Sequence, residues 1–383
     1  MPNRRKFIKN ASFLALGATG VVNGCVSEEK VANIVEEKYR FFIKKRTFPK
    51  LKVSMDRVIK ETVGLRPYRT LGPRIEKVSL GQKQLIHNYG HGGSGWSLSW
   101  GCAKRAVDLT DPLHAGEYAV LGCGVSGLST AILLQEQGKQ VNIYTQALPP
   151  AVTSSIATGT WSPDHYLAED AHIDEAFITQ WREDCTFSFR RFQDMLGLVD
   201  QVEWTDSYVL MHPQASPRQA SSSHLSIPGL LPETTEMDSQ SHPFPGWKVS
   251  HTSRMVFNIP LYLENMLSRF LAFGGKIHIK TFEKLEHIDE LQETIVFNCT
   301  GLGSKALFED EALLPVSGQL SFLLPQPELT YGIMGPDSYA IPRRDAIILG
   351  GNHIRGSWDT KPRKEETERV VSALREITEN MVY

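Results

Sequence analysis

One glycine-rich loop constrains the fold of this chain of 383 residues more than any other feature. The loop, Gly122-Cys123-Gly124-Val125-Ser126-Gly127, follows the apolar run from Glu117 to Leu121, which predicts a buried strand. Residues Val125 to Gln137 predict a helix that ends at Gly138, and Val141 to Tyr144 predict a second strand. A strand, a glycine turn, a helix and a second strand in this order are typical of a dinucleotide-binding βαβ unit.

The spacing of the glycines assigns each of them a physical role. Gly122 permits the tight turn after the strand, Gly124 lets the backbone approach a pyrophosphate, and Gly127 lets the helix pack closely on the strand. Backbone N–H groups at a helix N-terminus attract anions, so we expect Val125 and Ser126 to face the phosphates.

One position departs from the usual dinucleotide-binding pattern. An acidic residue commonly ends the second strand and binds the ribose hydroxyls, but here the candidate is Gln146. A neutral amide binds a hydroxyl less strongly than a carboxylate does. We therefore expect either a weaker hold on the adenosine or a contribution from Asn142 or another group.

The N-terminus reads as an export signal rather than as part of the fold. Asn3-Arg4-Arg5-Lys6-Phe7 is a twin-arginine pattern, and an apolar stretch from Ala11 to Val22 follows it. The stretch ends at Val22-Asn23-Gly24-Cys25, which resembles a lipoprotein cleavage box with Cys25 as the lipidated residue. The alternative is a plain cleaved signal with an incidental cysteine. We expect residues 1–25 to be the signal, residues 26–50 a charged tether, and the protein to be periplasmic or otherwise extracytoplasmic.

Charge and cysteine content exclude several classes of function. The formal net charge of −2 gives no general attraction to nucleic acid or to an anionic membrane. No segment after the signal approaches roughly 18 consecutive apolar residues, the length that spans a bilayer. The cysteines form no CxxC pair, which argues against a zinc site or a disulfide framework, so no metal is predicted. They are expected to be mostly buried small hydrophobes: Cys25, Cys102, Cys123, Cys185 and Cys299.

The glycine loop alone does not distinguish FAD from NAD, but further motifs in the sequence do. They are TSSIATGTW at Thr153–Trp161, VFNCTGLG at Val296–Gly303, PVSGQL at Pro315–Leu320, YAIP at Tyr339–Pro342, LGG at Leu349–Gly351, GLRPYR at Gly64–Arg69 and HNYGHGGSG at His87–Gly95. Together they closely resemble the D-amino acid oxidase and D-aspartate oxidase family over roughly residues 50 to 383. The resemblance implies FAD as the cofactor and an α/β fold with a Rossmann-type FAD-binding domain and a substrate domain built on a large mixed or antiparallel sheet. It assigns residues 51–165 and 251–310 to the first domain, and residues 166–250 and 311–383 to the second.

The resemblance also implies which residues contact FAD outside the first glycine loop. From the TSSIATGTW and NCTG motifs they are Ser154, Ser155, Gly159, Thr160, Trp161, Thr300 and Gly301. From the HNYGHGGSG motif they are Gly90, His91, Gly92, Gly93, Ser94 and Gly95. His87 and His91 have a spacing that could suggest a metal, but a glycine-crowded loop beside a flavin explains them better.

The order of the motifs predicts a circular permutation. In the family the GLRPYR and HNYGHGGSG segments close the chain, whereas here they precede the nucleotide-binding strand. The old C-terminal helix, residues 103–108, would run through residues 110–116 into the old first strand. The new ends would lie between a helix near residues 365–379 and the segment near residues 51–61. Such rearrangements are tolerated when the cut falls in an exposed loop and the original termini lie close together.

The resemblance implies a substrate site for an amino-acid carboxylate. Arg66 is the expected bidentate partner of the carboxylate, Tyr339 a hydrogen-bond donor to it, and the Gly93 carbonyl the acceptor for the amine. Arg69 is expected to be structural. Mammalian relatives carry a lid tyrosine four residues before Tyr339, where this chain has Gly335, so the lid must differ.

The reaction implied is oxidative deamination of a D-amino acid by hydride transfer from Cα to the flavin, with no general base required. The expected acceptor is O₂, with hydrogen peroxide as product. A flavin dehydrogenase that uses another acceptor and a non-catalytic flavin-binding protein stay open as alternatives, and the sequence does not predict an oligomeric state.

The sequence says little about the side chain of the preferred substrate. His353 and Arg355 lie where acidic-substrate relatives place basic residues, which would suggest D-aspartate or D-glutamate. The alternative, two solvated polar residues at a strand end, is slightly preferred. Ser162 replaces the bulkier polar residue that is common among neutral-substrate relatives, and Tyr331 is a second candidate near the altered lid.

Overall fold

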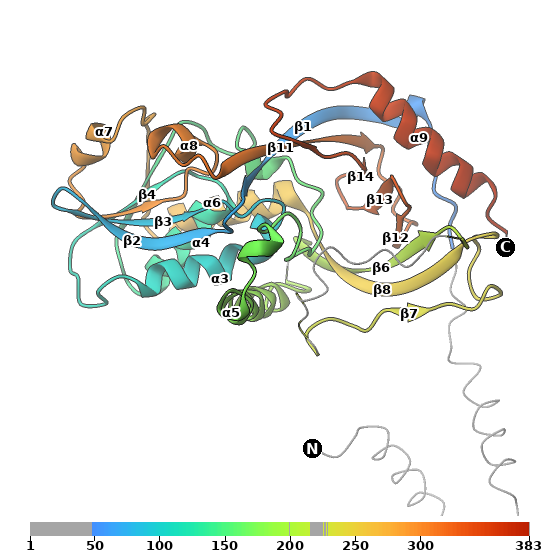
Figure 1. Cartoon of the computed structure of the whole chain (residues 1–383), viewed down its shortest axis with the longest axis horizontal. Coiled ribbons are helices and arrows are strands. Elements are labelled where there is room, and N and C mark those ends of the chain that lie inside the picture. The colour runs from blue at the N-terminus through green and yellow to red at the C-terminus, as the bar shows by residue number, and fades with distance from the viewer. Residues whose placement is uncertain (1–47, 199, 215–224, 226, 228, 383) are drawn as a thin grey trace, which may run out of the picture. The chain divides into compact units, whose positions relative to one another are not determined.

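The computed structural model describes residues 48–198, 200–214, 225, 227 and 229–382. The expected signal, its Cys25 and nearly all of the expected tether lie outside these residues. The described strands form two sheets, one of six strands and one of nine (Figure 1).

The smaller sheet carries the nucleotide-binding unit. In spatial order its strands are β2 (Arg74–Leu80), β3 (Lys83–Tyr89), β10 (Ile295–Asn298), β4 (Tyr118–Leu121), β5 (Val141–Thr145) and β9 (Lys276–Ile279). All neighbours are parallel except β2, which forms an antiparallel hairpin edge with β3. The carboxyl ends of β3, β10 and β4 therefore lie side by side, which is where parallel sheets bind their ligands.

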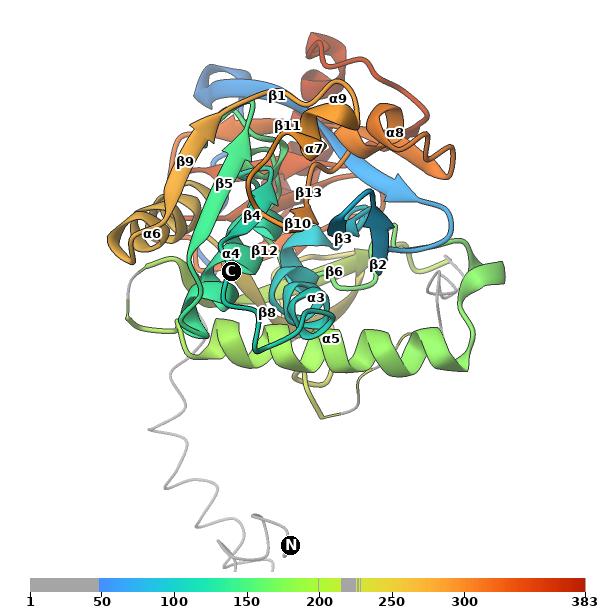
Figure 2. The ribbon, with the colours of Figure 1, turned by 90° about the vertical axis from the view of Figure 1, so that its left-hand side faces the viewer.

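Alternate residues of the smaller sheet face two different layers of helices. The helices are α3 (Gly95–Asp108), α4 (Val125–Glu136), α5 (Glu175–Gln193), α6 (Ile259–Ala272), α7 (Glu286–Asp289) and α8 (Gly303–Leu307). Val120 of β4 belongs to the core with α3, α4, α5 and α6, whereas Ala119 and Leu121 pack with Ile288 and Leu307 of α7 and α8. Figure 1 shows α3 and α5 on one side of the strands and α7 and α8 on the other, and Figure 2 shows α3 lying beside the long α5.

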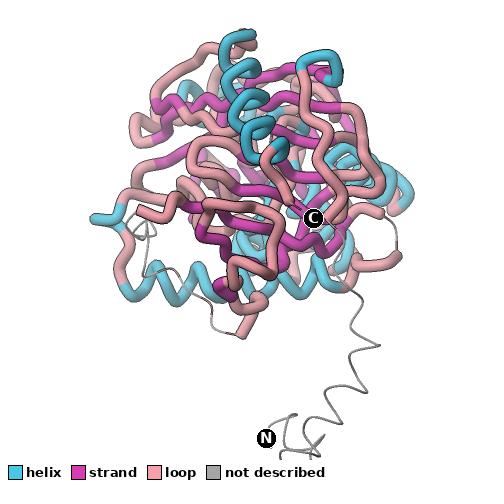
Figure 3. The backbone as a smooth tube through the Cα atoms, turned by 90° about the vertical axis from the view of Figure 1, so that its right-hand side faces the viewer, coloured by secondary structure: helices cyan, strands magenta, loops and turns pink. Residues whose placement is uncertain are grey.

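The larger sheet is mixed. Its strands are β1 (Val58–Arg69), β11 (Leu313–Leu323), β14 (Ile347–Gly350), β13 (Tyr339–Pro342), β12 (Tyr331–Met334), β6 (Val202–Met211), β8 (Lys248–Phe257) and β7 (Thr235–Glu236), with β15 (Ile354–Arg355) beside β11. Only the β12–β6 pair among these described strands is parallel. Helix α9 (Lys364–Glu379) packs Val370, Leu374 and Ile377 onto this sheet, and Figure 3 shows it crossing in front of the strands. Three short 3₁₀ helices, η1 (Met55–Arg57), η2 (Thr153–Ser155) and η3 (Asp170–His172), complete the described elements.

The predicted strand, helix and strand around the glycine loop are confirmed by β4, α4 and β5. The predicted helix at residues 103–108 is too short, because α3 begins at Gly95. Its first turns carry Trp96 and Trp100, four residues apart on one helix face, and both are buried. The predicted division of the chain into domains stays a prediction, although β1, from the range assigned to the first domain, pairs with β11 of the second range. None of the described helices is long and apolar enough to cross a membrane.

Candidate functional site

One cavity of 1360 Å³ contains most of the residues that the motifs single out. It extends from the carboxyl ends of β3, β4, β5 and β10 to the strands β1, β11 and β13 of the larger sheet. The predicted site residues that line it are Arg66, Gly90, His91, Gly92, Gly93, Gly95, Gly122, Gly124, Val125, Ser126, Gln146, Ser154, Gly159, Thr160, Thr300, Gly301 and Tyr339.

Four predicted cofactor residues do not line the cavity. Gly127 instead lies where a Cβ atom would overlap the Gly122 carbonyl, so it serves close packing of helix and loop. Ser94 is fully buried and donates its hydroxyl to the His165 carbonyl at 3.0 Å. Trp161 is buried against Phe189 and Phe192, and Ser155 ends the short helix η2.

The glycine loop leaves the N-terminus of α4 open toward the cavity. Gly122 has a φ of 102°, a left-handed conformation that favours glycine, and a Cβ there would lie 2.6 Å from the Cys299 carbonyl oxygen. Helix α4 begins at Val125 after Gly124, which offers no side-chain cap. The Val125 N–H donates to Ser154 Oγ at 3.0 Å, so Ser154 lies beside the loop. The remaining N–H groups and the helix dipole favour an anionic group here.

An asparagine network fixes the turn after β10. Asn298 Oδ1 accepts from the Thr300 hydroxyl at 2.7 Å and from the Thr300 N–H at 3.2 Å. Its Nδ2 lies 3.1 Å from Nδ1 of His87 on the neighbouring β3. The network locks the ends of two adjacent strands together and presents Thr300 and Gly301 to the cavity.

Both histidines of the HNYGHGGSG segment take part in hydrogen bonds. His91 Nε2 lies 3.1 Å from Asn88 Oδ1, and burial lowers the pKa of His91 to about 3 and that of His87 to about 4. Both are therefore neutral near pH 7. The described residues contain no cluster of potential ligands that could hold a metal ion.

Arg66 presents an unpaired buried donor to the cavity. It lies on β1 opposite Val316 of β11, and its Nη1 is buried without a hydrogen-bond partner among the described residues. Burial lowers the pKa of Arg66. A buried charge without a partner is costly, and an anion that reached the guanidinium would relieve this cost.

Tyr339 lies close to Arg66 and lines the same cavity. Its hydroxyl is 2.8 Å from Thr158 Oγ1, and burial raises the pKa of Tyr339. Two glycines of the PVSGQL and LGG motifs make room for this pair. A Cβ at Gly318 would overlap the Arg66 guanidinium, and one at Gly350 would overlap the Tyr339 hydroxyl. Both glycines belong to the motifs, but that they leave room for Arg66 and Tyr339 becomes evident only when the strands are paired.

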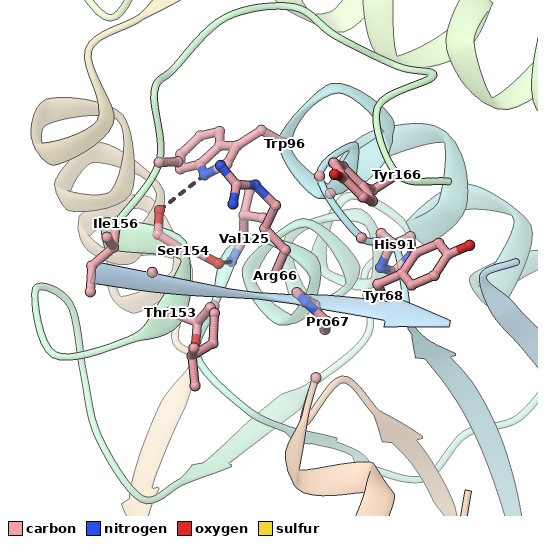
Figure 4. A pocket seen from close by; sticks show the side chains of 18 of the residues that line it. Arg66, Pro67, Tyr68, His91, Trp96, Val125, Thr153, Ser154, Ile156 and Tyr166 are labelled. Atoms are coloured by element: carbon pink, nitrogen blue, oxygen red, sulfur yellow. Dashed lines mark hydrogen bonds between the residues drawn. The ribbon is translucent and has the colours of Figure 1, made fainter. Parts of the chain in front are cut away.

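A loop that no motif marks encloses Arg66 on another side. Tyr166 has a φ of 50°, which is rare for a residue other than glycine, and its ring packs against His353 at 5.3 Å and Tyr68 at 5.9 Å between centroids. Its neighbour His165 accepts the Gly93 N–H through its carbonyl oxygen at 3.0 Å. Figure 4 shows Tyr166, Arg66 and Trp96 around the same space.

Two histidines beside Arg66 are uncharged. Burial, and then the charge of Arg66, lowers the pKa of His165 to about 3 and that of His353 to about 4. Their rings pack at 5.1 Å between centroids and line the cavity. Sequence reasoning found His353 but missed His165 and Tyr166, since nothing in their local pattern distinguishes them from an ordinary loop.

Contacts in the structure decide the predictions made for Arg69, Tyr331 and Arg355. Arg69 is structural, as predicted, because its Nε pairs with Asp310 Oδ2 at 2.8 Å. Tyr331 does not replace the missing lid tyrosine, because it is buried in the core of the larger sheet and donates its hydroxyl to the Pro49 carbonyl at 2.8 Å. Arg355 pairs with Glu169 and lies over the Tyr68 ring, outside the cavity lining.

Gln146 stands where dinucleotide-binding proteins commonly have an acidic residue that binds the ribose hydroxyls. Gln146 follows β5, is exposed and lines the cavity. Asn142 cannot share its task, because it lies outside the cavity and donates to Glu117 at 2.7 Å and to Glu293 at 2.6 Å. The cysteines among the described residues, Cys102, Cys123, Cys185 and Cys299, are free and buried, as predicted.

The arrangement fits FAD. A long cavity runs from an open helix N-terminus, suited to a pyrophosphate, to an unpaired arginine, suited to a substrate anion. Several glycines line the cavity, among them Gly92, Gly93, Gly124 and Gly159, and glycines let a bound group approach the backbone closely. The pyrophosphate would lie at Gly122, Gly124, Val125 and Ser126, and the ring system between the segment of residues 90–95 and that of residues 154–160.

Known proteins are similar to this chain over most of their length. The chain is 26% identical over 266 residues to a D-amino acid oxidase of Dugesia ryukyuensis, covering 68% of this chain and 76% of that protein. It is 27% identical over 278 residues to a D-amino-acid oxidase of Streptomyces coelicolor, covering 68% and 77%. It is 25% identical over 269 residues to the D-aspartate oxidase of Homo sapiens, covering 68% and 75%.

A solved structure shares the fold. The glycine oxidase of Bacillus cereus superposes with a TM-score of 0.50 at 13% identity, over 68% of this chain and 77% of that one. The family described as FAD dependent oxidoreductase, DAO, matches residues 10–109 and 117–381. This match confirms both the resemblance drawn from the motifs and FAD as the cofactor. The match extends over nearly the whole sequence, and the chain therefore belongs to the DAO family of FAD dependent oxidoreductases.

Proposed function

We propose that this FAD-dependent oxidoreductase deaminates a D-amino acid oxidatively to a 2-oxo acid and ammonia. The observation that carries the proposal is the buried Nη1 of Arg66, which lines the cavity and has no hydrogen-bond partner in the part of the chain that the structure describes. The names of the relatives, D-amino acid oxidase and D-aspartate oxidase, support the choice of substrate.

The substrate carboxylate would bind between Arg66 and Tyr339. A guanidinium meets a carboxylate with two parallel hydrogen bonds, each contributing roughly 1.5–3 kcal/mol when the groups are charged. Tyr339 would add a third bond from the opposite side, and Tyr166 would close the space above. Fixing the carboxylate leaves rotation about its bond to Cα, so a contact to the amine is also needed to orient the Cα–H.

The substrate amine must be neutral to react. The positive charge of Arg66 and the uncharged rings of His165 and His353 offer no partner for an ammonium group. A buried site of this kind favours the neutral amine. The Gly93 carbonyl would accept an amine N–H, which orients the lone pair. No general base is needed for this step, since the proton leaves to solvent before the C–H bond breaks.

FAD supplies the redox chemistry when bound, by accepting a hydride from Cα and passing the electrons to O₂ to give hydrogen peroxide. The resulting imino acid hydrolyses to the 2-oxo acid and ammonia.

Anaerobic reduction of the bound flavin tests the proposal. The purified protein is mixed with D-amino acids, L-amino acids, glycine and N-methyl amino acids, and the flavin absorbance is followed. We expect at least one D-amino acid to bleach the flavin while its L-enantiomer does not. Bleaching by none of them would leave a non-catalytic flavin protein.

The electron acceptor is tested separately. With O₂ as acceptor, each turnover in air yields one hydrogen peroxide. A yield well below this value, with faster turnover on a quinone analogue, would favour a dehydrogenase. The box ending at Cys25, with its implied membrane anchor, motivates that second candidate.

We further propose that the chain is exported by the twin-arginine route, as its Arg4-Arg5 signal indicates, and that Cys25 anchors it. A folded FAD protein suits this route, because the cofactor is taken up before export. Fractionation of expressing cells with and without the Arg4→Lys and Arg5→Lys substitutions tests it. Cytoplasmic accumulation of the double variant is expected, and unchanged export would contradict it.

We also propose that the chain is a circular permutant of its family. Two features support this. The Tyr331 hydroxyl lies next to segments near both ends of the described core, 2.8 Å from the Pro49 carbonyl and 3.9 Å from Met381 Sδ. The family match falls into two segments separated near the exposed residues 111–113. Close ends and an exposed junction are what a permutation requires.

A further inference from the structure

A threonine hydroxyl is paired with the tyrosine that lies close to Arg66. Thr158 Oγ1 is 2.8 Å from the Tyr339 hydroxyl oxygen, and both residues line the cavity. Within the part of the chain that the structure describes, neither hydroxyl makes another hydrogen bond. Each hydroxyl carries one proton and can also accept. One of the two protons therefore lies between the oxygens, and the other is left for a third group.

A buried arginine holds the backbone of Thr158 from one side. The Arg343 side chain is 2% exposed, and its Nη1 donates to the Ala157 carbonyl at 2.9 Å and to the Thr158 carbonyl at 3.3 Å. Its Nε donates to Asp345 Oδ1 at 2.9 Å, so the guanidinium is itself fixed. Arg343 directly follows β13, the strand that carries Tyr339. The same strand and the turn after it therefore contact both the hydroxyl and the backbone of Thr158.

Strand β8 holds the residues that follow Thr158. The Phe257 N–H donates to the Gly159 carbonyl at 2.7 Å, and the Trp161 N–H donates to the Met255 carbonyl at 2.9 Å. The backbone is thus anchored both at and after Thr158. These anchors belong to the fold, so the position of the threonine hydroxyl does not depend on a bound substrate. A group placed in advance loses less conformational freedom when a ligand binds.

The Tyr339 hydroxyl is confined as well. A Cβ atom at Gly350 of β14 would lie 2.3 Å from it, so the neighbouring strand closes one side. Thr158 occupies a second side. The charge of Arg66 acts on this tyrosine, and in the proposed function the substrate carboxylate is bound between the two. What is left to determine is the direction of the tyrosine proton.

The acidity of the two hydroxyls determines which of them donates to the other. A phenol is a stronger acid than an aliphatic alcohol, and the stronger donor makes the stronger bond to an anion. With a carboxylate at Arg66, the favoured chain therefore runs from the Thr158 O–H to the Tyr339 oxygen and from the Tyr339 O–H to the carboxylate. Hydrogen bonds in such a chain polarise and strengthen one another. The reverse order would turn the phenol oxygen, without its proton, toward the anion.

We propose that Thr158 is a positioning residue: its hydroxyl donates to Tyr339 and thereby directs the tyrosine O–H to the substrate carboxylate. This rests on the proposed function above. Arg343 and β8 contact only the backbone of this segment at residues 157–159, so a change of the Thr158 side chain leaves those anchors in place.

A double-mutant cycle tests whether Thr158 acts through Tyr339. The holoenzymes are wild type, Thr158→Val, Tyr339→Phe and the double variant, and the measurement is the apparent Kd of the D-amino acid in anaerobic flavin reduction. Valine keeps the branched shape of threonine and removes only the hydroxyl. We expect Thr158→Val to raise the Kd about 3- to 10-fold when Tyr339 is present, which is the value of one neutral hydrogen bond. In the Tyr339→Phe background the same change should stay within about 2-fold.

Two further variants separate this role from a structural one. Thr158→Ser restores the hydroxyl and should return the Kd to within about 2-fold of wild type. Thr252→Val is the matched control, because Thr252 is a buried threonine of β8 outside the cavity lining, and its Kd should equal that of wild type. An equal rise of the Kd from Thr158→Val in both backgrounds, or a rise in neither, would overturn the assignment.

Binding of a simple carboxylate gives a second readout that needs no turnover. Acetate is titrated into the holoenzymes and the flavin absorbance is followed, and the same pattern of Kd values is expected across the cycle. If no D-amino acid reduces the flavin, the proposed function fails, and the acetate titration still decides the role of Thr158. Equal acetate affinity in Thr158→Val and wild type, or no acetate binding to wild type, would overturn it.

Discussion

The Arg66 guanidinium lies over Gly318 of the neighbouring strand, so close that the glycine has no room for a side chain. Arg66 pairs with Val316 in the β1–β11 register, and a Cβ at Gly318 would overlap its guanidinium. The position of the arginine is therefore set by the neighbouring strand as well as by its own.

This contact predicts an effect of Gly318→Ala on substrate binding. The added methyl would push the guanidinium aside, and we expect the KM for the substrate to rise about 10- to 100-fold with FAD still bound. Gly350→Ala acts on Tyr339 in the same way, but it disturbs a neutral hydroxyl and should cost only about 2- to 10-fold. Steady-state kinetics on both variants checks the order. A larger effect for Gly350→Ala would mean that Tyr339, not Arg66, dominates carboxylate binding.

Gln146 predicts a gain in cofactor affinity. Gln146→Glu restores a carboxylate at the ribose hydroxyls, and a charge-assisted bond is about twice as strong as a neutral one, so the FAD Kd should fall about 3- to 10-fold. Gln137→Glu is the matched control, because Gln137 is exposed at the end of α4 and lies outside the cavity. Fluorescence titration of apoprotein with FAD measures both. An unchanged Kd for Gln146→Glu would show that the ribose is bound elsewhere.

Buried histidines predict a loss of stability in mild acid. The pKa values of His87 and His91 are about 4 and about 3 in the folded protein, against an ordinary value of 6.5. As pH falls below 6.5, the unfolded chain binds a proton at each and the folded protein does not. The free energy of unfolding then falls, by about 1.4 kcal/mol per pH unit for each proton.

Asp184 acts in the opposite direction, because burial raises its pKa to about 6 and the folded state binds that proton more readily. The two histidines still outweigh it. Denaturant unfolding of the holoenzyme between pH 6.5 and 5 checks the sign, and His87→Gln should reduce the slope by about one proton. Stability that rises toward pH 5 would refute the assignment of these histidines as neutral.

Reversing the proposed permutation should leave the fold intact. A chain that runs from Glu117 to Tyr383, then through a short linker to residues 48–109, places the glycine loop near its start. We expect it to fold and to bind FAD, because the joined ends already meet at Tyr331. Flavin absorbance and circular dichroism measure this. The same circle opened inside β11 serves as the control that should fail, and a colourless, unfolded product from the first chain alone would contradict the permutation.

The sequence predicted those parts of the fold that depend on residues close together in the chain. The unit of β4, α4 and β5 follows from an apolar run, a glycine turn and a helix period, all within thirty residues. Arg66 and Tyr339 could be singled out because each lies within a recognisable sequence motif.

Other residues of the site became evident only from tertiary contacts. Tyr166 lines the cavity with a backbone φ of 50°, and Arg254 of β8 lines it as well. Neither position can be predicted from the neighbouring residues in the sequence. Tyr331 failed as a lid candidate for the same reason, since the core of the larger sheet buries it.

The central claim is that Arg66 binds the substrate carboxylate. The apparent Kd of the D-amino acid, measured as the substrate reduces the flavin, tests this claim most directly. Arg66→Ala is compared with wild type and with Arg344→Ala, whose arginine is exposed and pairs with Asp200 at 3.0 Å. Anaerobic stopped-flow measurement of flavin reduction gives the apparent Kd for the D-amino acid. Losing two charged hydrogen bonds should raise this Kd at least about 100-fold in Arg66→Ala, with FAD bound and Arg344→Ala unchanged. An apparent Kd for Arg66→Ala equal to that of wild type would contradict the account.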